Sequence, residues 1–431
     1  MTSTETNRAI DAVWRIESPR LIAGIARIVR DVGLAEELAQ DALIAALEQW
    51  PEAGVPRNPG AWLMGVAKHR AIDMIRRQKV LDRKLEEVGR DLEIDRADQV
   101  PGADEMLPDD DEVGDDLLRL VFVSCHPVLS TDARVSLTLR LLGGLTTDEI
   151  ARAFLVSETT IAQRIVRAKR TLAEKKVPFE VPGREERAER LSSVLEVIYL
   201  VFNEGYSATA GDDWMRPGLC EDALRLGRVL AGLVPEEPEV HGLVALMEIQ
   251  ASRSRARVGP RGEPILLLDQ NRARWDQTLI RRGLAALAKA ESLGGADGHY
   301  ALQAAIAAVH ARARTAGDTD WVLMAGLYER LATSSPSPIV ELNRAVALSM
   351  AYGPQSGLDL LDQLLDEPAL QGYHLLPSVR GDFLVKLGRL AEAKNEFERA
   401  ASLTRNARER ELLLERAANA AAATEAVKST S

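Results

Sequence analysis

The chain has few cysteines and few aromatic residues. Cys125 and Cys220 are its only cysteines among 431 residues, which excludes a disulfide framework and fits a reducing compartment. Aromatic residues make up 4% of the sequence, which disfavours sandwiches and barrels. Frequent Ala, Leu and Arg instead favour helix. The composition therefore predicts an all-α protein, and the length predicts two to four domains.

Long apolar runs are also missing from the sequence. None approaches the roughly 20 residues that a membrane-spanning helix requires. The N-terminal stretch MTSTETNRAIDAVWRIESP has no basic segment followed by an apolar one, so it does not resemble a secretory signal. We expect a cytoplasmic protein with no membrane partner.

Charge is distributed unevenly along the chain. The net charge is −11, yet the stretch 86–116 alone holds 14 acidic residues against two arginines. Basic patches stand on either side of it: 61–84 has seven Lys or Arg, and 160–176 has six. Because local patches decide which partners a surface attracts, the acidic total does not exclude a nucleic-acid partner.

Changes in composition divide the sequence into four segments. Residues 1–84 are helical in pattern, and residues 85–113 form an acidic, proline-containing linker. Residues 114–177 are helical again, and the proline-rich VPFEVPG at 177–183 marks a boundary. Residues 184–431 form a long, almost wholly helical C-terminal domain.

Two helices are predicted in the first segment. LAEELAQDALIAALEQWP has helical spacing and is expected to end at Pro51. The next helix begins with Asn58 as its N-cap and Pro59 at its first position. Its apolar stripe consists of Leu63, Ala67, Ala71 and Met74.

The stretch TTDEIARAFLVSETTIAQRIVRAKRTL, at 146–172, predicts two short helices joined by a tight turn. Thr146 and Glu149 form a capping box for the first helix, and Ser157 caps the second. The first helix is expected to face inward with Ile150, Ala153 and Phe154. The second is expected to bury Ile161, Ile165, Ala168 and Leu172.

The other face of this second helix carries Thr160, Gln163, Arg164 and Arg167. These side chains can hydrogen-bond to base edges or to phosphates, as a recognition helix in the major groove requires. An ordinary solvated helix pair is the alternative interpretation, since arginine on a helix face is usually only hydrated.

Near the C-terminus the sequence fits a tetratricopeptide register. Gly381, Ala393, Phe397 and Ala400 fall at the expected positions, and a weaker copy surrounds Ala345, Gly357 and Leu361. The two copies are offset by about one repeat length. A generic antiparallel helical array is the alternative.

Taken together, these stretches resemble a bacterial RNA polymerase sigma factor of the extracytoplasmic-function group in the sigma-70 family. LAEELAQDALIAALEQW resembles the region 2 helix that docks on the polymerase β′ clamp. NPGAWLMGVAKHRAIDMIRR resembles the segment that melts and reads the −10 element, and 115–172 resembles region 4, which reads the −35 element. Blocks such as VFNEGYSATAGDD, LCEDALRLGRVL and SPIVELNRAVAL resemble the C-terminal, tetratricopeptide-like extension of one subgroup. Two departures stand out: Ala42 and Leu43 occupy positions where an aromatic is often found, and the linker is unusually acidic.

The resemblance implies partners and site residues. The partners are core RNA polymerase, through its β′ clamp and β flap, and promoter DNA; an intramolecular contact of the C-terminal domain with the sigma domains is also expected. The implied polymerase contacts are Glu36, Glu37, Gln40 and Asp41. The implied −10 contacts are Trp62, Arg70, Arg76, Arg77 and Lys79, with packing as the alternative role of Trp62. The implied −35 contacts are Thr160, Gln163, Arg164, Arg167 and Lys169.

Other polar clusters do not indicate catalysis. Cys125 and His126 lack two further nearby ligands for a zinc site. Glu204, Asp212 and Asp213 lack a companion nucleophile, phosphate loop or metal signature, so they predict a turn or domain junction. We therefore expect no catalytic residue, metal or cofactor. The competing functions are a stand-alone dimeric helix-turn-helix regulator and a helical-repeat scaffold that binds a protein or peptide.

Overall fold

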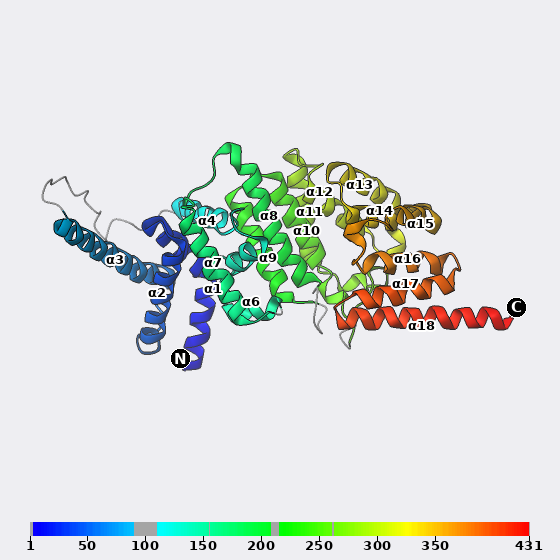
Figure 1. Ribbon diagram of the computed structural model, residues 1–431, viewed down its shortest axis with the longest axis horizontal. Helices are drawn as coiled ribbons and strands as arrows, with labels where there is room; N and C mark the ends of the chain where they lie inside the picture. Colours follow the sequence, from blue (N-terminus) through cyan, green and yellow to red (C-terminus); the bar gives the residue numbers. More distant parts are fainter. Residues whose placement is uncertain (1–2, 90–109, 155, 208–214, 261–262, 431) are drawn as a thin grey trace. The chain divides into compact units, whose positions relative to one another are not determined.

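The computed structural model describes residues 3–89, 110–154, 156–207, 215–260 and 263–430. These ranges contain eighteen α-helices and five short 3-10 turns, with a single isolated β-bridge between Val258 and Pro264 (Figure 1). The predicted all-α class is confirmed. The chain divides into two compact units, Met1–Ile198 and Tyr199–Ser431, and each is described by itself.

The first unit contains two groups of helices. α1, α2 and α3 pack on one another, and α1 also packs against α4. α5 packs against both α4 and α7, and α6 packs against α7. The bounds of these helices are α1 Ser3–Val29, α2 Val32–Ala53, α3 Pro59–Gly89, α4 Asp110–Ser124, α5 Thr131–Leu141, α6 Thr147–Phe154 and α7 Glu158–Glu174.

Helix α2 is longer than the sequence predicted. Its N-cap is Asp31, whose carboxylate accepts a hydrogen bond from the Leu34 backbone N–H at 2.9 Å. The expected end at Pro51 is wrong, because the helix continues to Ala53 and stops at Gly54, where φ is +84°. Proline removes one hydrogen bond to the preceding turn. That turn is exposed at Leu47, so water can satisfy the freed carbonyl.

The second helix of the first segment begins as predicted. The Asn58 side chain accepts a hydrogen bond from the Ala61 N–H at 3.0 Å, and Pro59 is the first residue of α3. α3 extends to Gly89 and α4 begins at Asp110, so both ends of the expected linker are helical. Residues 90–109 lie outside the described residues.

The helix pair at 146–172 also has the predicted caps. Thr146 and Glu149 exchange both hydrogen bonds of a capping box at the start of α6. The Ser157 hydroxyl accepts a hydrogen bond from the Thr160 N–H at 3.1 Å at the start of α7. Ile150 is buried as expected, whereas Ala153 and Phe154 are only half-buried. The four residues predicted for the inner face of α7 are all buried: Ile161, Ile165, Ala168 and Leu172.

Helix α8, Arg184–Tyr206, begins directly after the proline-rich boundary. Its first half nevertheless packs on the preceding helices. The Ser193 hydroxyl donates to the Cys125 carbonyl at 2.6 Å, and the Arg190 guanidinium donates to the Phe122 carbonyl at 2.9 Å. The first unit consequently ends inside α8, at Ile198, and not at the proline-rich segment.

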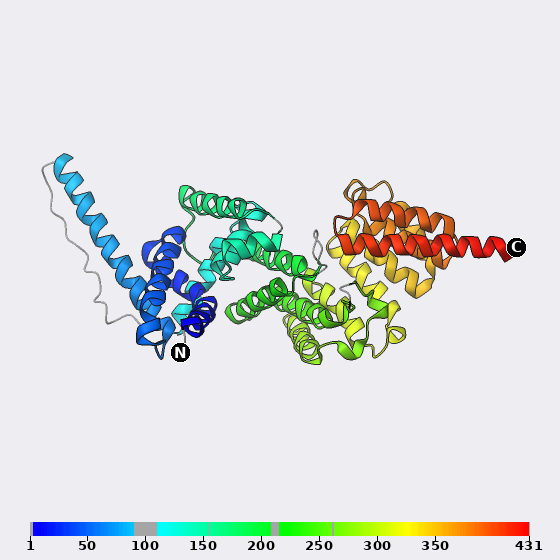
Figure 2. The ribbon, with the colours of Figure 1, turned by 90° about the horizontal axis from the view of Figure 1, so that it is seen from below.

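The second unit is a succession of antiparallel helix pairs (Figure 2). Gly381 on α16 is in the tetratricopeptide register, and a Cβ there would lie 2.7 Å from the Phe397 ring on α17. The other register residues are buried in the same core, as Ala393 and Ala400 show. The remaining helices are α9 Pro217–Leu233, α10 Pro238–Ala251, α11 Gln277–Ser292, α12 His299–Arg312, α13 Trp321–Ser334, α14 Pro338–Tyr352, α15 Pro354–Gln363, α16 Leu375–Lys386, α17 Leu390–Leu403 and α18 Ala407–Thr430.

Candidate nucleic-acid and polymerase interface

Two of the predicted −35 residues are solvent-exposed on the outward face of α7. Gln163 and Arg167 are exposed and lie one helical turn apart, opposite the buried apolar stripe. Thr160 is half-buried, and its hydroxyl lies 2.7 Å from that of the capping Ser157. A helix that is anchored on one side and polar on the other can present its outer side chains to a groove.

The remaining two −35 candidates are held by carboxylates. Arg164 forms an ion pair of 2.9 Å with Asp132 of α5, near the edge of the outward face. Lys169 points to the other side of α7, where its ammonium pairs with Glu36 of α2. The structure therefore groups Gln163, Arg164 and Arg167 together and separates Lys169 from them.

The basic face of α3 is partly solvent-exposed. Arg76 and Arg77 are exposed, whereas Arg70 pairs with Asp41 of α2 at 3.0 Å. Trp62 is half-buried and meets the buried Trp50 edge-to-face, with ring centroids 5.3 Å apart. Its position combines packing with partial exposure. Lys79 belongs to α3, but its side chain lies outside the described residues.

The predicted polymerase contacts lie on α2 in unequal environments. Glu37 is exposed, and together with Asp41 it borders a groove of about 430 Å³ between α2 and α3. Gln40 donates a hydrogen bond to the Glu36 carboxylate at 2.6 Å. Glu36 itself is only 3% exposed. Of the four residues, Glu36 is buried, and the other three are at least partly accessible to solvent.

Glu36 lies between two cations from the second group of helices. The Arg140 Nε of α5 donates to its carboxylate at 2.6 Å, and Lys169 of α7 pairs with the other oxygen. Burial by itself would raise the pKa of the Glu36 carboxyl. The charges of Lys169 and Arg140 outweigh that effect and hold the pKa below its ordinary value. Glu36 is therefore ionised at neutral pH and links α2 to α5 and α7.

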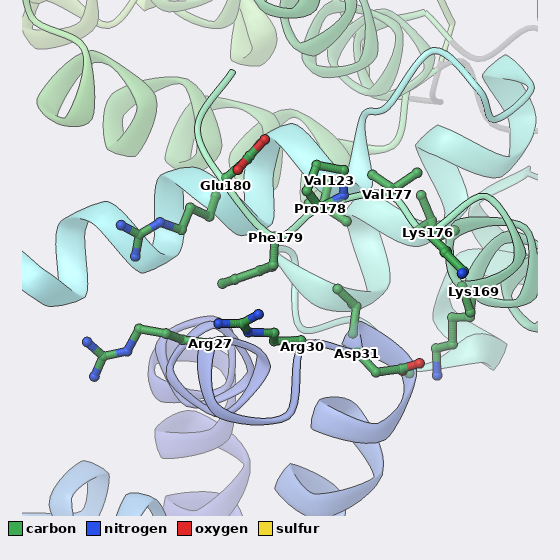
Figure 3. Close-up of a pocket in the computed structure, with 15 residues that line it drawn as sticks. Arg27, Arg30, Asp31, Val123, Lys169, Lys176, Val177, Pro178, Phe179 and Glu180 are labelled. Atoms are coloured by element: carbon green, nitrogen blue, oxygen red, sulfur yellow. The ribbon is translucent and has the colours of Figure 1, made fainter. Parts of the chain in front are cut away.

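A hollow of about 700 Å³ lies beside this ion cluster, between the α1–α2 junction, α4 and the end of α7 (Figure 3). Arg30 and Lys176 border it, and both have left-handed backbone conformations, with φ of 55° and 49°. Figure 3 shows Phe179 above Arg30 in this hollow. Charged side chains such as Arg27 and Lys169 and apolar ones such as Leu172 and Phe179 line this hollow together, so the junction is not closely packed here.

The polar clusters that the sequence did not assign to the interface are packed. Cys125 is buried with its Sγ 3.2 Å from the Thr138 hydroxyl, and burial raises its pKa to about 11. Glu204 forms an ion pair with Arg216. Asp212 and Asp213 lie outside the described residues. No group of three or more His, Cys, Asp or Glu in the described ranges could hold a metal ion.

Sequence reasoning missed Arg140 as a partner of Glu36. Arg140 stands in the apolar run VSLTLRLLGG, where nothing distinguishes it from a solvated helix residue. The two residues are 104 positions apart, so only the packing of α2 against α5 and α7 brings them together.

No helix in the described part of the chain is long and apolar enough to span a membrane.

Three family models match parts of the chain. Sigma-70 region 2 matches residues 14–80, and Sigma-70, region 4 matches residues 119–172. A family of unknown function, DUF6596, matches residues 190–291. These matches coincide with the α1–α3 group, the α4–α7 group and the start of the C-terminal extension.

Relatives extend the match over most of the chain. "Uncharacterized protein R00370" of Rhizobium meliloti (strain 1021) is 43% identical over 93% of each chain. "ECF RNA polymerase sigma factor SigK" of Mycobacterium ulcerans is 29% identical over 36% of this chain and 78% of its own length. The protein of the same description from Mycobacterium tuberculosis (strain ATCC 25618 / H37Rv) is also 29% identical over 36% of this chain.

The two sigma regions, their order and their helical geometry agree with one another. None of the observations favours a stand-alone dimeric regulator or a scaffold. The chain belongs to the extracytoplasmic-function sigma factors of the sigma-70 family, and it is a transcription initiation factor with a C-terminal helical extension.

Proposed function

We propose that α7 reads the −35 element through Gln163, Arg164 and Arg167. The observation that carries this proposal is the polar stripe of α7, which lies opposite a fully buried apolar stripe on a capped helix. In the same proposal Arg76 and Arg77 of α3 contact the −10 region. Phosphate contacts position such a protein, while base contacts provide specificity.

In the absence of polymerase, the two sigma regions are proposed to be held against each other by internal ion pairs, an arrangement that we call closed. Lys169, a −35 candidate, neutralises Glu36, a polymerase candidate. In the same way Arg70 neutralises Asp41. Candidate DNA contacts and candidate polymerase contacts therefore form ion pairs with each other in the free protein. Binding of core RNA polymerase replaces these internal ion pairs with contacts to the β′ clamp and lets the two sigma regions separate.

Two features support opening at this junction. Ion pairs can be exchanged for other ion pairs, so a partner that supplies cations to Glu36 and Asp41 offsets much of the cost of breaking them. The adjacent hollow also means that few apolar contacts are lost there when α7 moves away from α2.

The C-terminal extension is proposed to regulate the sigma regions in cis. α8 supports this proposal because it is one continuous helix that belongs to both units. Its first half bonds to α4 and α5 through Ser193, Arg190 and the Arg134–Glu196 pair. A change in the extension that shifts α8 would therefore reach region 4 directly.

The −35 assignment is tested with two single variants, Arg164→Ala and Arg167→Ala. Loss of a bidentate base contact weakens promoter binding of the polymerase complex by roughly 1–3 kcal/mol. Arg281→Ala is the matched control, because Arg281 is an exposed helical arginine on α11. Wild-type transcription by both variants from the native promoter would overturn the assignment.

A further inference from the structure

A cavity of about 560 Å³ lies within the second unit, and nothing in the sigma mechanism uses it. It opens among α8, α10, α12, α13 and α14, with Tyr373 at one side. Its volume is in the range of pockets that hold small organic ligands. Its lining combines aliphatic side chains with three tyrosines, two histidines and one arginine, and no lining residue is acidic.

Amide side chains reach the cavity from four different helices. These are Asn203 of α8, Gln250 of α10, Gln303 of α12 and Asn343 of α14. Gln303 is held in place: its amide oxygen accepts from the Tyr199 hydroxyl at 3.1 Å, and its amide nitrogen lies 2.8 Å from the His299 Nε2. Asn343 lines the cavity from its solvent-exposed side, and its side chain makes no hydrogen bond to another residue of the described ranges. The lining thus includes one amide that is held in place, Gln303, and one that is open to solvent, Asn343.

His310 provides a second, independent observation. It borders the cavity from α12, is only 8% exposed and meets Trp321 edge-to-face at 5.3 Å. Its Nδ1 is buried without a hydrogen-bond partner among the described residues. Burial, together with Arg253 and Arg272, lowers its pKa to about 3, so the ring is neutral. A buried ring nitrogen left unpaired is costly, and a ligand could satisfy it.

Arg253 is the cation of the cavity and has no carboxylate partner in the described part of the chain. Its guanidinium bonds to the Tyr206 hydroxyl and the Gln250 amide, and it faces the Tyr206 and Trp275 rings at 5.7 and 5.8 Å. Its Nε is also buried and unpaired within the described residues. The groups bonded to this guanidinium are neutral, and the other charges felt at the site include the cations Arg257 and Arg272. Such a guanidinium attracts a carboxylate.

We propose that this cavity binds a small acid that joins a carboxylate, an amide and an apolar or aromatic group. An N-acylated amino acid and the C-terminal end of a peptide share this chemistry. Arg253 takes the carboxylate, Asn343 and His310 bond to the amide, and the aliphatic and tyrosine side chains cover the apolar group. The C-terminal extension would then be the part of this sigma factor that senses a ligand.

Titration calorimetry with the full-length protein tests the proposal with three probes. These are N-acetyl-phenylalanine, its carboxamide, and a hexapeptide that ends in phenylalanine. We expect the acid to bind at least tenfold more tightly than the carboxamide, which lacks only the charge. Binding of the acid but not the hexapeptide identifies a small-molecule site; binding of both identifies recognition of a chain end.

Two variants keep the test specific. Asn343→Leu should weaken binding of the acid at least tenfold, while Asn395→Leu should leave it unchanged, because Asn395 is exposed on α17 away from the cavity. Far-ultraviolet circular dichroism verifies that both variants fold. The proposal is overturned if no probe binds at millimolar concentration, if acid and carboxamide bind equally, or if Asn343→Leu binds like wild type.

Discussion

Replacing Glu36 by Gln tests the closed arrangement of the two sigma regions. The substitution keeps the shape of the side chain and its hydrogen bond with Gln40, but it removes the charge. Arg140 and Lys169 then face each other without a counterion at a site that is almost fully buried. Removing one partner of a buried ion pair typically costs 3–5 kcal/mol. Because the glutamine still hydrogen-bonds, we expect about 3 kcal/mol, at the lower end of that range.

Hydrogen exchange measured by mass spectrometry gives the free energy of opening for peptides from α2, α5 and α7. A loss of about 3 kcal/mol corresponds to roughly 100-fold faster exchange of these peptides in Glu36→Gln. Glu37→Gln is the matched control: it is the adjacent glutamate on the same helix, and it is exposed. The control should exchange like wild type. Equal protection in both variants would refute the idea that Glu36 holds the two regions together.

Two further predictions concern the same unit. Because the folded-state pKa of Glu36 is lowered, the stability that its charge adds to the folded unit is present above pH 4.5, its ordinary pKa, and is lost as the pH falls below it. Tryptophan fluorescence should therefore show acid-induced opening of the wild-type protein in that range. The pH response should be smaller in Glu36→Gln. Truncation after Lys176 should destabilise region 4, because it removes the bond from Arg190 to Phe122 of α4 and the bond from Ser193 to Cys125 just after α4. Truncation after Ile198 keeps both bonds. Equal melting temperatures for the two truncated chains would contradict the second prediction.

Local features of the fold were predictable because their signals are local. The caps at Asn58, Thr146 and Ser157 depend on side chains one turn from the groups they satisfy. The inner face of α7 followed from apolar periodicity. The tetratricopeptide register predicted the positions of Gly381 and Phe397, which the structure brings into close contact. Each of these rests on residues within about twenty positions of one another.

Features that depend on distant residues were not predictable. Pro51 was expected to end α2, yet exposure of the preceding turn lets the helix continue. The proline-rich segment was expected to separate two domains, but α8 bonds back to α4 across it. The burial of Glu36 depends on Arg140 and Lys169, which are more than a hundred residues away. No pattern around Glu36 distinguishes it from exposed Glu37.

The central claim is that promoter recognition by this chain requires RNA polymerase. Fluorescence anisotropy with a labelled promoter duplex, read with and without core polymerase, measures it most directly, and run-off transcription from the same duplex confirms initiation. The account predicts weak binding by the free protein, because Lys169 and Arg70 form ion pairs with Glu36 and Asp41. It predicts tight, sequence-specific binding by the polymerase complex. Tight, sequence-specific binding by the free chain as a dimer, with no stimulation by polymerase, would contradict it.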